Sequence, residues 1–203
     1  MTTNSLLKTS AAAAVFSALA LSGLLLTSRL SQAANDKNPT QDEKQKILIG
    51  AQINPVLLTV SKKDADTVYL GSYIVNASCV ECHTAPTFAP GGDPFKGQPK
   101  VINAAKFLAG GGVFGPFTSR NLTPDATGKP AGLTFSDFEQ VMRHGTDFDH
   151  AHPQFGPLLQ VMPWPAFQNM TDRDLQAIYA YLSAIPCVEG HPGDPADTSI
   201  RCH

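Results

Sequence analysis

The chain has 203 residues, of which 42% are hydrophobic and 16% charged, and its formal net charge is −2 at neutral pH. This size and composition indicate one folded domain with a core of its own, and the near balance of charges gives no indication of nucleic-acid binding. Residues 35–106 contain eight Lys and seven acidic residues, whereas acidic residues outnumber basic ones by ten to five from residue 107 on. Ordinary solvated surface accounts for this asymmetry, and a docking face is the alternative.

Residues 1–34 have the pattern of a secretory signal peptide. Lys8 precedes an apolar run over residues 11–26, and small residues suited to a signal peptidase stand at Ser31-Gln32-Ala33. Cleavage near Ala33 or Ala34 leaves about 170 residues with a net charge of −4. An uncleaved N-terminal anchor that holds the protein at the membrane is the alternative, although the apolar run is short for a bilayer span. We therefore expect export to the periplasm, as a soluble or N-terminally anchored protein.

Residues 35–63 are expected to form a linker and an arm. The first part is polar, contains Pro39 and predicts a flexible leader up to residue 46. Residues 47–60 are apolar but contain Gly50 and Pro55. Because two helix breakers lie within this short stretch, we expect extended segments packed on the domain.

A helix is predicted over residues 64–76. Asp64 and Asp66 suit its first turn, and Val68 and Tyr69 begin an apolar face of helical spacing. Gly71 disfavours an isolated helix by about 1 kcal/mol relative to Ala. Its expected use is close crossing with a second helix, for which residues 172–184 are the strongest candidate.

The segment Cys79-Val80-Glu81-Cys82-His83 has two cysteines three apart and a histidine directly after the second. This pattern is typical of covalent haem attachment, in which both thiols form thioether bonds and the imidazole of His83 binds the iron. A zinc half-site would need two more ligands at paired spacing, and a thioredoxin-type dithiol should follow a strand. Export favours haem, because thioether formation and lasting disulfides belong outside the bacterial cytoplasm. We predict one covalently bound haem c.

Residues 84–130 are rich in Gly and Pro and predict a long loop region. So long an irregular stretch needs a surface to wrap, and a haem would supply it. The apolar side chains available to pack on it are Phe88, Phe95, Phe107, Val113, Phe114, Phe117 and Leu122.

Two more helices follow. Thr134 and Gly145 are the expected ends of a helix over residues 134–144, whose buried side consists of Phe135, Phe138, Val141 and Met142. The next stretch, Asp147 to His152, is interpreted as an exposed polar loop, with a weak metal site or a second iron ligand as alternatives. Thr171 caps the last helix, and Pro186 follows its end. Cys187 and Cys202 are expected to form a disulfide that stabilises the tail, residues 187–203, by about 3 kcal/mol.

A second iron ligand is expected from outside the motif. The candidates are Met142, Met162, Met170, His144, His150, His152, His191 and His203. Met162 lies just before Pro163 and Pro165, which predict a rigid extended segment, and a thioether held by a rigid loop loses little entropy when it binds. We assign Met162 to the distal face, with Met142, Met170, a histidine or an open site as alternatives. His83 and Met162 together saturate the iron, so that the chemistry left is outer-sphere electron transfer at a potential above that of bis-histidine ligation.

Several segments together resemble bacterial class I c-type cytochromes, and more closely the single haem modules in cytochrome subunits of alcohol and gluconate dehydrogenases. These segments are Gly71–Val75, Cys79–Thr84, Asn121–Asp125, Met142–Gly145, Met162–Trp164 and Met170–Leu182. The resemblance covers about Val68 to Pro186. It implies an all-α cytochrome c fold of about three to five helices around one haem, in a domain over residues 64–186. It also implies attachment through Cys79 and Cys82 with His83 and Met162 as ligands.

The expected function is that of a periplasmic monohaem cytochrome that carries single electrons and is not itself an enzyme. Its partners would be a dehydrogenase or quinol-oxidising complex and a terminal acceptor. One alternative is a fixed electron-transfer subunit of a membrane-associated dehydrogenase complex. The other, of a different class, is a haem-based sensor or a peroxidase-like enzyme.

Overall fold

A computed structural model describes residues 39–150, 152–190 and 202–203. The chain divides into two units, Met1–Gln41 and Asp42–His203, and the second contains all that is discussed below except Gln41, the first residue of α2. Its α-helices are α2 (Gln41–Ile53), α3 (Ala65–Ser78), α4 (Val80–His83), α5 (Phe135–His144), α6 (Trp164–Phe167) and α7 (Asp172–Ala184). The expected signal peptide at 1–34 lies outside the described residues. None of the helices in the described part of the chain has the length and hydropathy needed to cross a bilayer.

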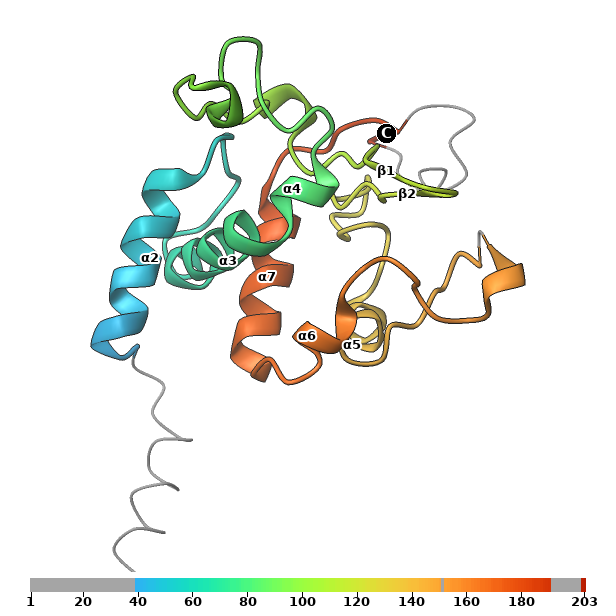
Figure 1. Cartoon of the computed structure of the whole chain (residues 1–203). Helices are drawn as coiled ribbons and strands as arrows, with labels where there is room; N and C mark the ends of the chain where they lie inside the picture. The colour runs from blue at the N-terminus through green and yellow to red at the C-terminus, as the bar shows by residue number, and fades with distance from the viewer. Residues whose placement is uncertain (1–38, 151, 191–201) are drawn as a thin grey trace, which may run out of the picture. The chain divides into compact units, whose positions relative to one another are not determined.

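The centre of the fold is the crossing of α3 and α7 (Figure 1). Leu175 and Tyr181 of α7 and Val75 of α3 are completely buried in the shared core. A Cβ atom at Gly71 would overlap the carbonyl group of Ala177, so the two backbones can meet only because this residue is glycine. The predicted helices at 64–76 and 172–184 are confirmed, and so is the expected use of Gly71.

The helix α2 corrects the sequence-based expectation for the arm. Residues 41–53 are helical where we expected a flexible leader followed by extended segments. Gly50 lies against the backbone of Tyr69 in α3, and its carbonyl oxygen accepts a 2.8 Å hydrogen bond from the hydroxyl of Ser72. Contact with α3 therefore outweighs the low helix propensity of glycine. Residues 54–60 belong to no helix or strand, and they pass beside the end of α7, where Thr59 N donates to Ala184 O.

The region from residue 84 to 130 is a long series of loops, as predicted, with three short ordered pieces. These are single 3₁₀ turns at Pro94–Lys96 and Ala104–Lys106 and an antiparallel ribbon of β1 (Val113–Phe114) and β2 (Phe117–Thr118). Another 3₁₀ turn, Pro153–Phe155, lies further along the chain. The helical architecture is consistent with a cytochrome c fold. The ribbon was not expected in an all-α protein, and the described residues contain six α-helices where we expected three to five, because α4 and α6 are single turns.

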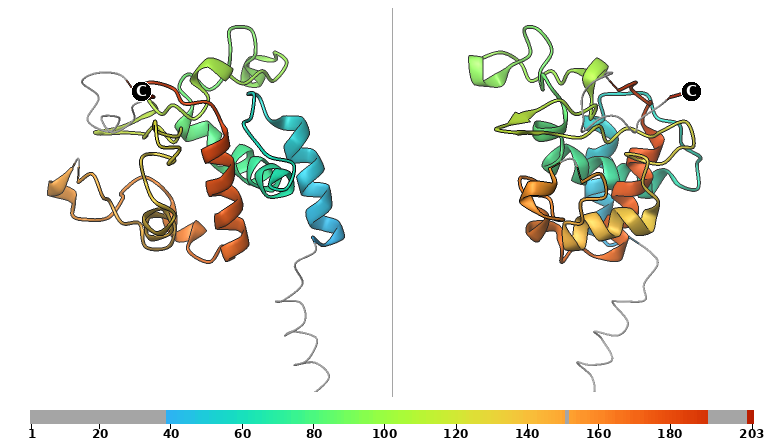
Figure 2. Two further views of the ribbon diagram at one scale, coloured as in Figure 1. Left: turned by 180° about the vertical axis from the view of Figure 1, so that it is seen from behind. Right: turned by 90° about the vertical axis from the view of Figure 1, so that its right-hand side faces the viewer.

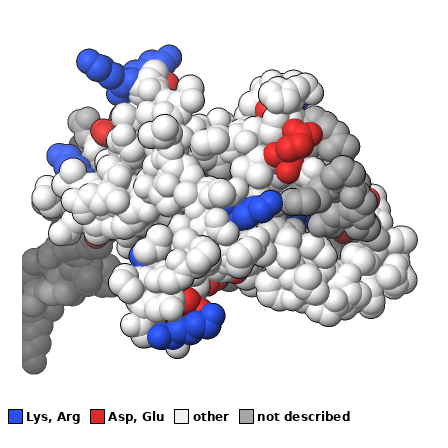
Figure 3. Space-filling model, turned by 90° about the horizontal axis from the view of Figure 1, so that it is seen from above, with Lys and Arg blue, Asp and Glu red and all other residues white. Residues whose placement is uncertain are grey.

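The helix α5 lies beside the lower half of α7, and the two are seen crossing in the right-hand view of Figure 2. Its predicted ends are confirmed: Thr134 accepts a hydrogen bond from Asp137 N, and Gly145 adopts the left-handed conformation. The predicted disulfide between Cys187 and Cys202 is also present. On the face seen in Figure 3, the described charged side chains stand in small separate groups. That face carries no broad patch of one sign among the described residues.

Candidate cofactor site

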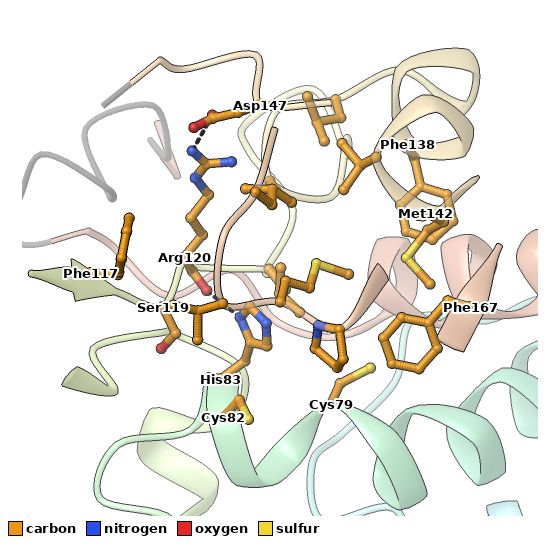
Figure 4. Close-up of a pocket in the computed structure, with 18 of the residues that line it drawn as sticks. Cys79, Cys82, His83, Phe117, Ser119, Arg120, Phe138, Met142, Asp147 and Phe167 are labelled. Carbon is orange, nitrogen blue, oxygen red and sulfur yellow. Dashed lines mark hydrogen bonds and ion pairs between the residues drawn. The ribbon is translucent and has the colours of Figure 1, made fainter. Parts of the chain in front are cut away.

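The five residues of the cysteine motif form one helical turn that continues α3. Cys79 N bonds to Val75 O at 2.9 Å, and His83 N bonds to Cys79 O at 3.0 Å. Because residues three and four apart lie on the same side of a helix, the turn presents both thiols and the imidazole in one direction. Figure 4 shows Cys79, Cys82 and His83 together along this turn, below an open space.

The loop over residues 108–120 fixes the orientation of His83. Gly110 N donates to His83 O at 2.8 Å, and the Nδ1 atom of His83 is 2.8 Å from Arg120 O. A carbonyl oxygen can only accept, so Nδ1 carries the proton and Nε2 is left unprotonated. Burial lowers the pKa of His83, which favours this neutral form. The ring therefore offers a bare nitrogen, which is the form that binds a metal.

The motif opens onto a cavity of about 190 Å³. Apolar side chains form most of its walls, including Phe138 and Met142, which face the motif from the other side in Figure 4. Met162 also lines this cavity, and it comes from the segment between α5 and α6. Thus the cavity brings together all four side chains predicted to hold the haem: Cys79, Cys82, His83 and Met162.

The apolar side chains that were expected to pack on the haem divide into two groups. Phe114, Phe117 and Leu122 line the cavity, whereas Phe88, Phe95, Phe107 and Val113 do not. Phe107 is buried against Tyr181 in the core, and the side chain of Phe95 is 87% exposed. Among the other candidate ligands that the structure describes, Met142 and His152 line the cavity. His191 lies outside the described residues.

The segment that carries Met162 differs in one respect from our prediction. Pro165 does not prevent a helix, because it falls in the first turn of α6, where its missing N–H is unneeded. Trp164 N bonds back to Met162 O at 2.8 Å, and the Trp164 ring packs against Gly145 at the end of α5. Met162 therefore lies in a segment that is fixed at the capped end of α5 and at the helical turn α6.

The Cys79 thiol lacks the property that a redox dithiol needs. Burial raises the pKa of the Cys79 thiol to about 11. Disulfide oxidoreductases need a cysteine of lowered pKa, because the thiolate is the nucleophile. Cys79 is thus a poor nucleophile for disulfide exchange. Within the described ranges, no group of three or more His, Cys, Asp or Glu side chains is arranged to hold a metal ion.

One functional feature could not be seen in the sequence. Arg120 and Asp147 both line the cavity, and their side chains form an ion pair of 2.5 Å. We expected Asp147 to lie in an exposed polar loop, but it is buried, so that expectation was wrong for this residue. Burial alone would raise the pKa of Asp147, but hydrogen bonding to Arg120 and the guanidinium charge hold it below its ordinary value.

Two thiols, an unprotonated imidazole nitrogen and a thioether around one apolar cavity fit a covalently attached haem. A helical domain with this donor set has the features of c-type cytochromes. Comparison with known proteins also points to c-type cytochromes. The chain is 34% identical over 121 residues to the cytochrome c subunit of an alcohol dehydrogenase (quinone) from Gluconacetobacter polyoxogenes, which covers 58% of this chain and 22% of that protein.

Two further relatives support the same assignment. The gluconate 2-dehydrogenase cytochrome c subunit of Pantoea cypripedii is 32% identical over 114 residues, covering 55% of this chain and 21% of the relative. A diheme cytochrome c-type protein of Cereibacter sphaeroides is 27% identical over 125 residues, which cover 59% of this chain and 34% of that protein. The chain thus spans about a fifth of the length of the first two relatives. No family model matches the chain, and no solved structure does.

Proposed function

We propose that this chain is a monohaem c-type cytochrome of the periplasm that carries single electrons. One observation supports the proposal above the others: Cys79, Cys82, His83 and Met162 line the same apolar cavity. A haem bound there supplies an iron that changes oxidation state by one electron. We expect one haem per chain, because the sequence contains one attachment motif.

The side chains have separate tasks in this proposal. Cys79 and Cys82 hold the cofactor through thioether bonds, so that it stays with the protein through every cycle. His83, oriented by the carbonyl group of Arg120, would bind the iron through Nε2. Met162 would be the second protein ligand and would leave no open site for a substrate, while the apolar walls would exclude water and favour the reduced state.

The relatives favour a second candidate, a fixed subunit of a dehydrogenase complex. Three of them are named as cytochrome subunits of alcohol, gluconate and fructose dehydrogenases. Either as carrier or as subunit, the chain would receive electrons from a dehydrogenase and would not itself catalyse substrate oxidation. The two candidates differ in whether the partner stays bound.

The test is expression of the whole chain in a bacterium with a competent haem-attachment system. The expected product is a red protein that keeps its haem on a denaturing gel, at one haem per chain. A colourless product, or more than one haem per chain, would overturn the proposal. Gentle purification from the native membrane and soluble fractions then separates the candidates, because a subunit will copurify with a dehydrogenase and a carrier will not.

A further inference from the structure

Arg120 makes contacts on both sides of the cavity. Its backbone carbonyl accepts the hydrogen bond from His83 Nδ1, as described above. Its side chain extends the other way and pairs with two carboxylates, with Nη2 at 2.5 Å from Asp147 and Nε at 3.0 Å from Asp149. Figure 4 shows the guanidinium reaching up from the level of His83 to Asp147. We call Arg120, Asp147 and Asp149 the Arg120 brace.

The carboxylate at the far end of this brace is firmly held. Asp147 accepts hydrogen bonds from the backbone N–H groups of Asp149 and His150, both at 3.2 Å, besides the bond from Arg120. The exposed fractions of the Arg120 and Asp147 side chains are 21% and 9%. An exposed ion pair contributes little to stability, but a pair this enclosed leaves a buried charge without a partner when it is broken.

Asp147 also begins the loop that leads to Met162. Asp147 N donates to Pro157 O at 2.9 Å, and Leu159 N donates to Gly145 O at 2.8 Å. These two bonds hold residues 145–147 beside residues 157–159 and return the chain to the cavity three residues before Met162. The position of Asp147 therefore limits where the Met162 segment can lie.

We infer that Arg120 is a positioning residue for both axial ligands: its carbonyl orients His83, and its guanidinium fixes the loop that presents Met162. This inference rests on the proposed function, since it concerns how the two ligands are held. The two roles use different atoms of one residue. A side-chain substitution keeps the carbonyl and so acts on the Met162 side alone.

The consequence is a measurable change in how firmly Met162 stays on the iron. Loss of supporting contacts around metal ligands commonly weakens metal binding by about 10-fold or more. In Arg120→Ala holoprotein, free imidazole should therefore displace Met162 about 10-fold faster than in the wild type. The sulfur-to-iron absorption band of the ferric protein should weaken in parallel. Asp147→Asn, which keeps the shape of the side chain and removes its charge, should change both quantities in the same direction.

Arg173→Ala is the matched control. Arg173 also pairs with a carboxylate in another element, Glu43 of α2, but it does not line the cavity. This variant should keep the wild-type band and the wild-type rate of imidazole binding.

Two results would decide against the inference. Wild-type imidazole binding in both Arg120→Ala and Asp147→Asn would overturn it, whatever their melting temperatures. Equal acceleration in Arg173→Ala would also overturn it, since the effect would then be general loosening. If Arg120→Ala does not accumulate, Asp147→Asn alone decides. A wild-type protein without the sulfur-to-iron band would instead contradict the proposed ligation by Met162, so the two failures are distinguishable.

Discussion

Gly71 of α3 lies so close to Ala177 of α7 that a methyl group added at Gly71 would meet the Ala177 carbonyl oxygen and the Cβ atom of Tyr181. Gly71→Ala must therefore push the two central helices apart. Overpacking of this kind costs about 3 kcal/mol, even though alanine is the better helix former. The free energy of unfolding, measured by urea denaturation of the holoprotein, should fall by that amount.

Thr67→Ala is the matched control for this substitution. Thr67 is exposed on the same helix, so its replacement changes helix propensity without changing the crossing. Its effect should stay within about 0.5 kcal/mol. Unchanged or increased stability of Gly71→Ala would contradict the close approach of α3 and α7.

The proposed thioether attachment leads to a second prediction. Cys79→Ser and Cys82→Ser each leave one thiol able to react with the cofactor, so we expect far less covalently bound haem in either variant. The measurement is haem staining on a denaturing gel, normalised to the amount of chain. Cys187→Ser is the control, because it removes a cysteine of the disulfide, which does not line the cavity, and should leave covalent haem in place. A wild-type yield of covalent haem in the two motif variants would rule out the assigned attachment.

Much of the fold could be predicted from the sequence because its signals are local. The caps at Thr134 and Thr171 are contacts between residues three apart, and the cysteine motif is a single turn. The helix α2 was missed because the contact that stabilises it, between Gly50 and α3, joins residues about twenty positions apart. The Arg120 brace was missed for the same reason, since nothing near Arg120 in the sequence indicates that Asp147 will be buried beside it.

Met162 and Met142 both line the cavity and should respond differently to truncation. Met162→Ala should abolish the sulfur-to-iron band of the ferric protein and lower the reduction potential, because methionine ligation raises it. Met142 is 4% exposed and packs in the core, so Met142→Ala should keep the band and lower the free energy of unfolding by about 3 kcal/mol. Absorption spectra of the two oxidised variants make the comparison. The assignment of Met162 fails if its variant has the wild-type spectrum, or if the band is lost only in Met142→Ala.

Asp147 should make stability depend on pH in the acid range. Arg120 lowers its pKa in the folded protein, so the ionised carboxylate is favoured by folding. This stabilisation is fully present above the unfolded-state value of about 4 and is lost as the pH falls through the folded-state value. Asp147→Asn should therefore cost about 2 kcal/mol at pH 7 and progressively less below pH 4.

Urea denaturation of the wild type and of Asp147→Asn between neutral and acid pH measures this difference. Asp66→Asn, at an exposed position in the first turn of α3, is the comparison variant and should have a small effect at neutral pH. A difference between wild type and Asp147→Asn that stays constant down to strongly acid pH would show that the charge of Asp147 does not contribute.

The rim of the cavity predicts how electron exchange will respond to salt. Phe114 and Val161 line the cavity and are partly exposed, and Phe155 packs against the lining residue Phe117. From residue 110 to 119 there is no charged residue, and Asp149 is the only one from 148 to 163. Encounters through a rim with so few charged side chains gain little from electrostatic steering. The rate of electron self-exchange between oxidised and reduced protein should therefore change by less than about 10-fold between about 0.01 M and 1 M salt.

Phe155→Lys tests whether this rim is the surface through which electrons pass. It places like charges opposite each other when two copies meet, so self-exchange should slow at low salt and recover as salt screens the repulsion. Phe95→Lys adds the same charge at a side chain that is 87% exposed and away from the cavity, and it controls for the change in net charge. NMR line broadening in mixtures of the two oxidation states gives the rates. Equal slowing by both variants would place the exchange surface elsewhere, because only the overall charge would then matter.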